Sequence, residues 1–273
     1  MTRAMLANPR SRPNGPPETA ALLIACVLAA VATATMLLVR PALAGDQPVS
    51  LREALIGSTA QDGRSHVHAP LVARYVSVDG DRFVLDRTGA AALVRFERSD
   101  EVWALRGYPA PGGDVLYKND IGMPVLRATR LGGVTLFTSH SPAGEPAQLI
   151  GSATPSRPPH VSPAALPALL QSAILRVAHQ AGVAPFKMRI EGEGEPFLFA
   201  DTLNVTADTL VRMAQLNEGR PYVRRIHEVV IRPGRRPDVR VRGALLEITI
   251  SPRDGIAGRP SSGRIARAVV EAR

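Results

Sequence analysis

Cysteine is almost absent from this sequence. Cys26 is the only cysteine among 273 residues, so residues 45–273 contain none. That segment therefore cannot form an internal disulfide, present a thiolate nucleophile or build a cysteine-ligated zinc or iron–sulfur site. Packing alone must hold its fold.

The sequence also lacks the motifs of several enzyme classes. It has no Gly-x-Ser-x-Gly nucleophile elbow, and no serine lies three residues before Lys118 or Lys187, the only two lysines. His227-Glu228 lacks the second histidine of a zincin motif, because position 231 is isoleucine. Walker and dinucleotide-binding glycine patterns are missing. We therefore predict no cofactor and no metal, and the motifs identify no catalytic residue.

A long apolar run, residues 20–39, is the most informative feature that is present. Three arginines precede it, and the small-x-small sequence Ala42-Leu43-Ala44 follows it. This order is the layout of an export signal. As a helix the run would be about 30 Å long, enough to cross a bilayer core. Residues 1–44 are thus predicted to be either a signal peptide cleaved after Ala44 or a retained N-terminal membrane anchor.

Both alternatives give the same location for the rest of the chain. The arginine-bearing end stays in the cytoplasm under the positive-inside rule. Residues 45–273 are therefore expected in the periplasm or another extracytoplasmic space. They would be attached to the inner membrane only through residues 20–39, and only if the signal is not cleaved.

Positive charge is concentrated near the C-terminus. Residues 220–273 hold 13 arginines against 5 acidic residues, whereas residues 45–219 hold 16 basic against 18 acidic residues. Arginine supplies almost all of this charge, which suits planar, bidentate contacts with anions. A codon preference for arginine explains the same bias without a function.

The pattern of residues predicts an α+β fold in two halves. Residues 45–69 form a polar linker, and residues 70–140 alternate between apolar and polar positions in about seven short runs separated by turn signals. This half is predicted to be an antiparallel meander, either a small barrel or a strongly twisted sheet. Residues 141–162 are rich in Pro, Gly and Ser and are predicted to form a connector.

Residues 163–273 are predicted to form an α/β half. Apolar residues at helical spacing indicate helices at residues 163–181 and 206–219, with short strands at 186–190 and 197–199. Two long runs, 222–232 and 239–250, are predicted to pair as a basic β-hairpin through the turn at 233–238. Residues 265–270 are predicted to form either a last strand or a short helix.

Three stretches of the β-rich half resemble a known family. They are residues 83–89, 101–105 and 116–138. The chain resembles an uncharacterised family of exported bacterial proteins that carry a signal peptide and a domain of unknown function. The resemblance covers roughly residues 70–250. It implies export and a shared fold, and it implies no activity and no site residues.

Four groups of polar residues have the composition of a site but are explained better as solvated segments and turns. Zinc or copper could bind His66, His68, His140 and His160, and calcium could bind Glu191, Glu193 and Glu195. Carboxylate-based glycoside hydrolysis could use Asp79, Asp81 and Asp86. A lysine base could lie in the group Lys118, Asn119 and Asp120.

An arginine cluster is the strongest candidate binding site. Residues 220–242 contain eight arginines and two acidic residues. Arg235, Arg236, Arg240 and Arg242 are the candidate anion-binding residues, and Arg240 and Arg242 point to the same face of a strand. Protection of a sheet edge by charge is the alternative explanation. Outside the cytoplasm, anionic lipid or acidic polysaccharide is the expected partner, and nucleic acid is not.

These features together predict a non-catalytic protein of the cell envelope that binds or scaffolds. The alternative is an envelope hydrolase whose carboxylates converge only in the folded chain. A cleft with two carboxylates about 5–10 Å apart would favour the hydrolase. A basic surface without such a cleft would favour binding.

Overall fold

The structure is a computed structural model that describes residues 70–272. These residues belong to one compact unit, Gly63–Arg273. The predicted signal or anchor at residues 1–44 and the whole predicted linker, residues 45–69, lie outside the described residues. Among residues 70–272, no helix has the length and apolar character needed to cross a membrane.

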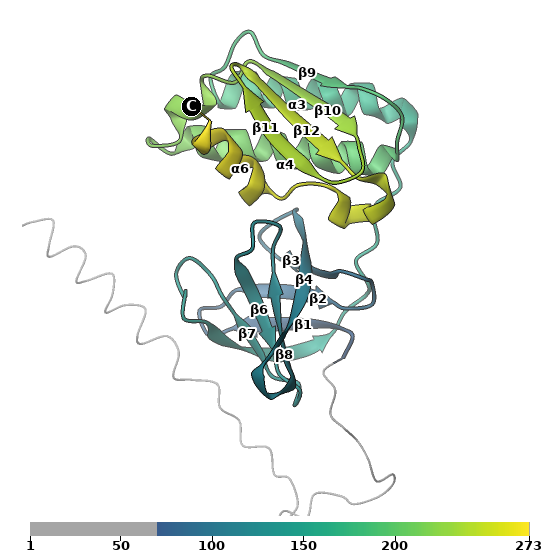
Figure 1. Cartoon of the computed structure of the whole chain (residues 1–273), viewed down its shortest axis with the longest axis vertical. Helices are drawn as coiled ribbons and strands as arrows, with labels where there is room; N and C mark the ends of the chain where they lie inside the picture. The colour runs from purple at the N-terminus through teal and green to yellow at the C-terminus, as the bar shows by residue number, and fades with distance from the viewer. Residues whose placement is uncertain (1–69, 273) are drawn as a thin grey trace, which may run out of the picture. The chain divides into compact units, whose positions relative to one another are not determined.

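The first half is a closed antiparallel barrel, which confirms the predicted meander (Figure 1). Each strand pairs with the next along the chain, and the last strand pairs with the first. The strands are β1 (Val72–Ser77), β2 (Arg82–Asp86), β3 (Ala92–Phe96), β4 (Val102–Ala110), β5 (Asp114–Lys118), β6 (Pro124–Ala128), β7 (Val134–Leu136) and β8 (Glu145–Ser152). A 3-10 turn, η1 (Pro111–Gly113), joins β4 to β5.

Aromatic side chains fill part of the barrel interior. Tyr75 and Phe83 face each other across β1 and β2 with ring centroids 5.5 Å apart. Phe96 lies 5.7 Å from Phe83 and 6.1 Å from Trp103, so the contacts run across four neighbouring strands. Such pairs contribute about 0.5–1.5 kcal/mol each beyond the area they bury. A chain with few aromatic residues thus uses several of them in one small core.

Strand β8 lies inside the segment predicted to be a connector. Its residues are mostly exposed, including Leu149 and Ile150. Only Glu145 is buried, and Ala147 packs partly against the core. The strand therefore lacks the alternation that marks a half-buried strand in sequence, and it forms because β1 and β7 both offer it backbone hydrogen bonds. The irregular connector shortens to residues 153–162.

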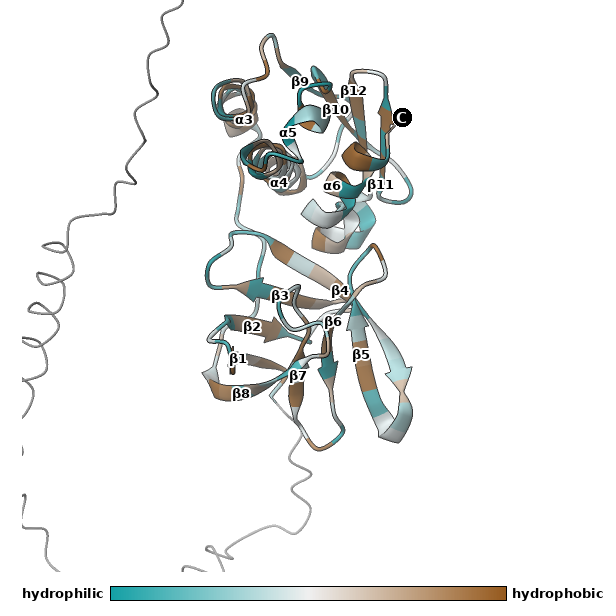
Figure 2. Ribbon diagram, turned by 90° about the vertical axis from the view of Figure 1, so that its left-hand side faces the viewer, coloured by the Kyte–Doolittle hydropathy of each residue, from teal (hydrophilic) through white to brown (hydrophobic). Residues whose placement is uncertain are grey.

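The second half is a four-stranded sheet covered by helices. Its helices are α3 (Leu166–Gln180), α4 (Pro196–Gln215), α5 (Arg220–Val223) and α6 (Ser262–Glu271), with 3-10 turns η2 (Pro163–Ala165) and η3 (Pro252–Gly258). The strands are β9 (Lys187–Ile190), β10 (Glu228–Pro233), β11 (Asp238–Arg242) and β12 (Leu245–Ile250), in the spatial order β11-β12-β10-β9. Figures 1 and 2 both place α3 and α4 on the same face of this sheet.

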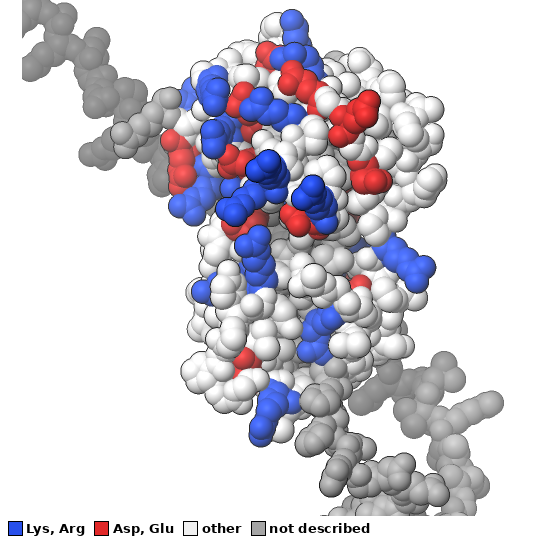
Figure 3. Space-filling model, turned by 45° about the vertical axis from the view of Figure 1, so that its right-hand side comes forward, with Lys and Arg blue, Asp and Glu red and all other residues white. Residues whose placement is uncertain are grey.

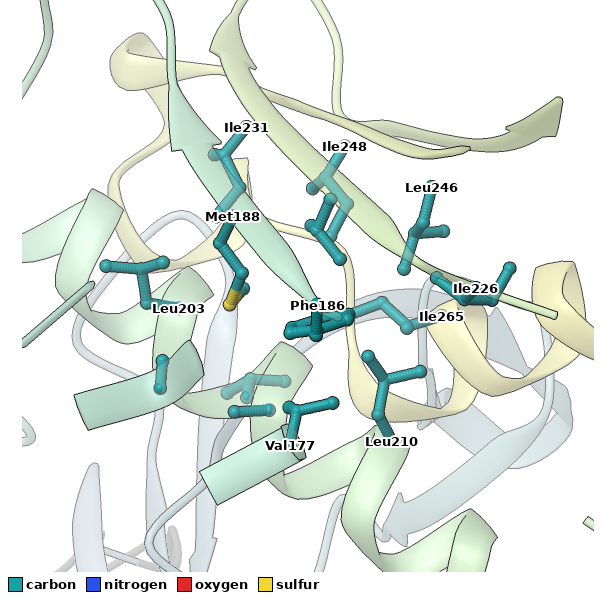
Figure 4. Packing of buried hydrophobic residues seen from close by; sticks show 14 of the residues in the cluster. Val177, Phe186, Met188, Leu203, Leu210, Ile226, Ile231, Leu246, Ile248 and Ile265 are labelled. Carbon is teal, nitrogen blue, oxygen red and sulfur yellow. The ribbon is translucent and has the colours of Figure 1, made fainter. Parts of the chain in front are cut away.

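A second hydrophobic core lies between that face and the helices. Figure 4 shows Met188, Ile231 and Leu246 from the strands packed with Val177 of α3 and Leu210 of α4. The helices contribute apolar residues at helical spacing, and the strands contribute every second residue. This core and the barrel core are two separate clusters of buried residues.

The expected hairpin through residues 233–238 is wrong in its pairing. Strand β10 pairs in parallel with β12, and β11 pairs antiparallel with β12 across Gly243, whose φ is +60°. The physical reason is the composition of the strands. Strand β12 presents Leu246, Ile248 and Ile250 to the core and belongs in the middle, whereas the arginines of β11 suit an edge.

The boundaries of the second predicted helix also differ. Helix α4 begins at Pro196, so residues 197–199 are helical rather than a strand, and Thr206 lies in mid-helix. The Thr206 hydroxyl donates a hydrogen bond to the Thr202 carbonyl at 2.7 Å, which satisfies its polarity inside the helix. Residues 265–270 belong to α6, which is the helical one of the two alternatives.

Asp86 provides a test of the barrel. Burial by itself raises the pKa of its carboxyl, but hydrogen bonds from the Thr88 hydroxyl and N–H and from the Ser156 N–H outweigh burial and hold the pKa below its ordinary value. The pKa of Asp86 is therefore higher in the unfolded chain, which binds the carboxyl proton more tightly than the folded chain does. The carboxylate stabilises the fold fully above about pH 4 and loses that effect as the pH falls through the folded pKa.

We predict that Asp86→Asn lowers the free energy of unfolding at pH 7 by about 1–3 kcal/mol. The difference from the wild type should shrink below about pH 4, as the wild-type carboxylate is protonated. Urea unfolding followed by Trp103 fluorescence measures both. Asp81→Asn in the neighbouring turn is the control and should change little. A difference that is the same at pH 3 and pH 7 would contradict the assignment.

Candidate functional site

The sheet of the second half has one face covered by helices and one face that carries charged side chains. Residues that alternate with the core-facing positions point to this second face. We call it the arginine face, and its charged residues are Lys187, Arg189, Glu228, Arg232, Asp238, Arg240, Arg242 and Glu247. Figure 3 shows basic and acidic side chains interspersed on this half of the protein.

Two carboxylates of the arginine face each contact two guanidinium groups. Glu247 Oε2 lies 3.4 Å from both Arg232 and Arg242. Asp238 contacts Arg240 Nε at 2.8 Å and Arg264 Nη2 at 3.1 Å. Each carboxylate therefore neutralises half of the positive charge around it. The arginines are held in place and still carry surplus charge.

A groove of about 470 Å³ lies over these ion pairs. Its lining residues are Arg232, Arg236, Pro237, Asp238, Arg240, Glu247, Thr249 and Arg264. Four arginines and two carboxylates give the groove a net charge of +2, from 4 − 2. Guanidinium N–H groups in such a fixed arrangement suit the oxygens of a phosphate or carboxylate.

The structure brings together some of the four predicted anion-binding residues and not others. Arg236 and Arg240 line the groove. Arg242 does not line it, but it contacts Glu247, which does. Arg235 and Arg236 lie exposed on the loop between β10 and β11. Within the described part of the chain, neither of these two side chains has an ion-pair partner. Arg232 and Arg264 join the site although the sequence did not single them out.

A second cavity, of about 560 Å³, lies beside α4; we call it the junction cavity. It contains four acidic side chains, which bear on the hydrolase alternative: Asp100, Glu101, Asp201 and Asp208. Glu101 and Asp201 both form ion pairs with Arg259, and Asp208 pairs with Arg176 at 2.8 Å. Guanidinium partners thus account for three of the four carboxylates, which gives an acid–base pair no specific support.

Arg259 is the centre of a buried polar network that connects the two halves. Its side chain is 2 % exposed, and that of Glu101 is 5 % exposed. Arg259 also donates a hydrogen bond to the Val102 carbonyl at 2.8 Å, and Glu101 accepts one from the Ser262 N–H at 2.9 Å. Nearby, Asp120 accepts hydrogen bonds from the Ser261 N–H and hydroxyl. We call Arg259, Glu101, Asp201, Asp120, Ser261 and Ser262 the junction network.

Sequence reasoning missed this network. Residues 251–263 are rich in turn formers, which predicts an exposed segment. A signal that could have been used is Ser261, which caps α6 by accepting a hydrogen bond from the Arg264 N–H at 3.1 Å. A cap locates the helix, but nothing local shows that the arginine two residues earlier is buried.

The histidines and the glutamates show no convergence in the described residues. His66 and His68 lie outside those residues, and His140 and His160 are exposed on separate loops. Glu191, Glu193 and Glu195 are exposed, and Glu191 pairs with Arg189 at 3.1 Å. Between residues 70 and 272 no group of three or more His, Cys, Asp or Glu side chains is arranged to hold a metal ion.

The three aspartates of the first hairpins have structural contacts. Asp79 accepts a hydrogen bond from the Ser141 hydroxyl at 3.2 Å, and Asp81 lies in the same turn. Asp86 is buried and anchors Ser156 of the connector through a hydrogen bond of 2.7 Å. None of the three lines the junction cavity or the groove of the arginine face.

The Lys118-Asn119-Asp120 group separates into three roles. Lys118 Nζ lies 5.1 Å from the centroid of the Tyr108 ring, a cation–π contact. The Asn119 side chain accepts hydrogen bonds from the Ile121 and Met123 N–H groups and shapes the turn. Asp120 belongs to the junction network. None of the three is placed as a base.

Comparison with known proteins identifies a family. The sequence profile of a family described as a domain of unknown function (DUF4908) matches residues 50–269. Neither a curated protein nor a solved structure matches the chain.

The junction network generates a prediction about stability. Arg259→Met leaves Glu101 buried without its cation, so we expect the free energy of unfolding to fall by about 3–5 kcal/mol. The double variant Arg259→Met/Glu101→Met removes both charges and should lose less than the single variant. Urea unfolding measures both.

Arg253 is the matched control for Arg259. It lies exposed in η3, six residues away, and Arg253→Met should change the free energy of unfolding by no more than about 0.5 kcal/mol. Equal effects at positions 253 and 259 would show that burial of the ion pair does not determine the loss.

Proposed function

The chain belongs to the DUF4908 family, and we propose that it is an exported, non-catalytic protein of the cell envelope that binds anionic lipid surfaces through its arginine face. The observation that carries the proposal is the sharing of Asp238 and Glu247, each by two arginines. Surplus positive charge is thereby fixed on an open sheet face next to Arg235 and Arg236, which have no ion-pair partner among residues 70–272.

The expected affinity of the arginine face is low. Each basic residue near an anionic membrane contributes on the order of 1 kcal/mol within roughly a Debye length. If half of the eight arginines in residues 220–242 face the membrane, the sum is roughly 3–4 kcal/mol. That free energy corresponds to binding in the millimolar range. Such a contact concentrates the protein at a surface and does not select one molecule.

The location rests on residues 1–44. Their order of charge, apolar run and small-x-small site supports export of everything that follows. The lack of cysteine in the exported segment is compatible with an oxidising compartment, because no free thiol is left to react.

We therefore predict that a C-terminal reporter active only outside the cytoplasm is active when fused to this chain. The control is the same fusion without residues 1–44, which should be inactive. Sequencing of the mature N-terminus then distinguishes cleavage, with Gly45 first, from a retained anchor. Reporter activity confined to the cytoplasm would contradict the export signal.

A second prediction concerns vesicles that contain phosphatidylglycerol. The chain that follows residue 44 should co-sediment with them at low salt and should be released as salt rises, because salt screens exposed charges. Replacing Arg235, Arg236, Arg240 and Arg242 with Ser should abolish this co-sedimentation. It should leave the fold intact, because all four side chains are exposed.

The matched control removes the same charge elsewhere. Arg82, Arg95, Arg106 and Arg130 are exposed on the barrel, and their replacement with Ser should leave most of the binding in place. Equal losses in the two variants would mean that net charge, and not the arginine face, governs binding. Unchanged binding of the first variant would reject the role. Loss of solubility in the first variant would favour the alternative that these arginines protect the β11 edge. Binding to an acidic polysaccharide and not to vesicles would show that the polysaccharide is the partner.

A further inference from the structure

The junction cavity has features that the arginine face does not explain. Its volume of about 560 Å³ lies within the range of roughly 300–1,000 Å³ that is typical of small-molecule sites. Most of its lining comes from three segments far apart in sequence. They are the start of β4 with the loop before it, the connector, and one face of α4.

Part of the cavity lining is apolar. Helix α4 contributes Phe197, Ala200, Val205 and Val211, interleaved on the same face with polar lining residues such as Asp208. Further apolar lining comes from Val102, Val161, Leu169 and Ile256. A surface of this kind favours an aliphatic or ring-shaped body over an ion.

Three arginines of the cavity lining carry positive charge that no ion pair neutralises. Arg98, Arg157 and Arg212 are exposed and line the cavity, and within residues 70–272 none of them has an ion-pair partner. Of the lining carboxylates, Asp208 is paired with Arg176, whereas Glu101 and Asp201 share the one guanidinium of Arg259, so one of their two charges and that of Asp100 remain unbalanced. The unbalanced charges are thus three positive against two negative.

The connector wall of the cavity is held at both ends. Its first part is fixed where the Ser156 N–H donates to buried Asp86 at 2.7 Å. Its far end is fixed where Ser162 caps η2 by accepting a hydrogen bond from Ala164 at 3.3 Å. Between them, Pro158 and Pro159 restrict the backbone. The cavity is therefore largely formed before any ligand enters.

We propose that the junction cavity binds an amphipathic anion, with an acyl chain or similar apolar body against the apolar part of the lining and a carboxylate or phosphate among Arg98, Arg157 and Arg212. The partly formed walls, the apolar lining residues and the three arginines without ion-pair partners in the described residues fit such a molecule. The site is separate from the arginine face and does not depend on the function proposed for it.

Photo-crosslinking tests this proposal on the full chain in membranes. The probe is dodecanoic acid with a diazirine near its chain end, and the comparison probe is the corresponding neutral alcohol. Adducts mapped by mass spectrometry should fall on cavity residues within 156–161 or 197–215. At concentrations below saturation, the acid should label them about tenfold more than the alcohol, which corresponds to one strong charge contact.

Two variants and one control separate charge from shape. Arg98→Ser/Arg157→Ser/Arg212→Ser should reduce labelling by the acid to the level of the alcohol. Gln215→Trp, at an exposed lining position, should reduce labelling by both probes because the ring fills the cavity. Arg82→Ser/Arg95→Ser/Arg106→Ser removes the same charge from the barrel and should leave labelling unchanged.

Three outcomes would overturn the proposal. They are adducts outside the cavity, equal labelling by the acid and the alcohol, and full labelling of the triple arginine variant. The two proposed sites are also distinguishable. The cavity variants should still co-sediment with anionic vesicles, and the variant at positions 235, 236, 240 and 242 should still be labelled in the cavity.

Discussion

The buried guanidinium of Arg259 is the interaction on which the arrangement of this protein depends. The barrel and the α/β half have separate apolar cores, so no shared core connects them. Arg259 instead reaches Glu101 and the Val102 carbonyl at the start of β4 and Asp201 in α4. A buried charge is tolerated only when it is paired and hydrogen-bonded, and this one has partners in both halves.

The same few residues also position the candidate sites. Ser261 and Ser262 attach the start of α6 to the barrel carboxylates Asp120 and Glu101. Two residues further along α6, Arg264 contacts Asp238 of the arginine face. Glu101, Val102 and Asp201 line the junction cavity as well. The junction network thus borders the junction cavity and, through α6, leads to one ion pair of the arginine face.

The sequence predicts the elements of this fold better than it predicts their pairing. Alternation in the sequence predicts seven barrel strands, and it matches one buried and one less buried face in strands such as β1 and β7. Strand β8 does not show this alternation, because pairing with its neighbouring strands, and not burial of one of its faces, holds it in place. The hairpin error has a related cause. Local sequence predicts extended runs at residues 222–232 and 239–250. It does not show that the first run begins inside α5, that the second turns at Gly243 into β11 and β12, or that β12 lies between β11 and β10.

The candidate sites show the same limit. The arginines at positions 240 and 242 are visible as a pair on one strand face, because their spacing of two residues is local. Arg232 and Arg264 join them through Glu247 and Asp238 only in the folded chain. The junction cavity is less visible still. Arg98, Arg157 and Arg212 lie in three separate segments, and no spacing relates them before the Arg259 network brings the halves together.

Edge protection and anion binding are both consistent with the arginines of β11, and they make different use of the guanidinium group. Protection of an edge requires only exposed charge, and lysine would serve as well as arginine. Binding of a phosphate or carboxylate instead uses the planar fork that lysine lacks. In the ion pairs of Asp238 and Glu247 each arginine contributes one nitrogen to the contact, so these pairs do not themselves occupy the fork. An anion bound at the arginine face would use the remaining N–H groups, whereas edge protection would leave them to water.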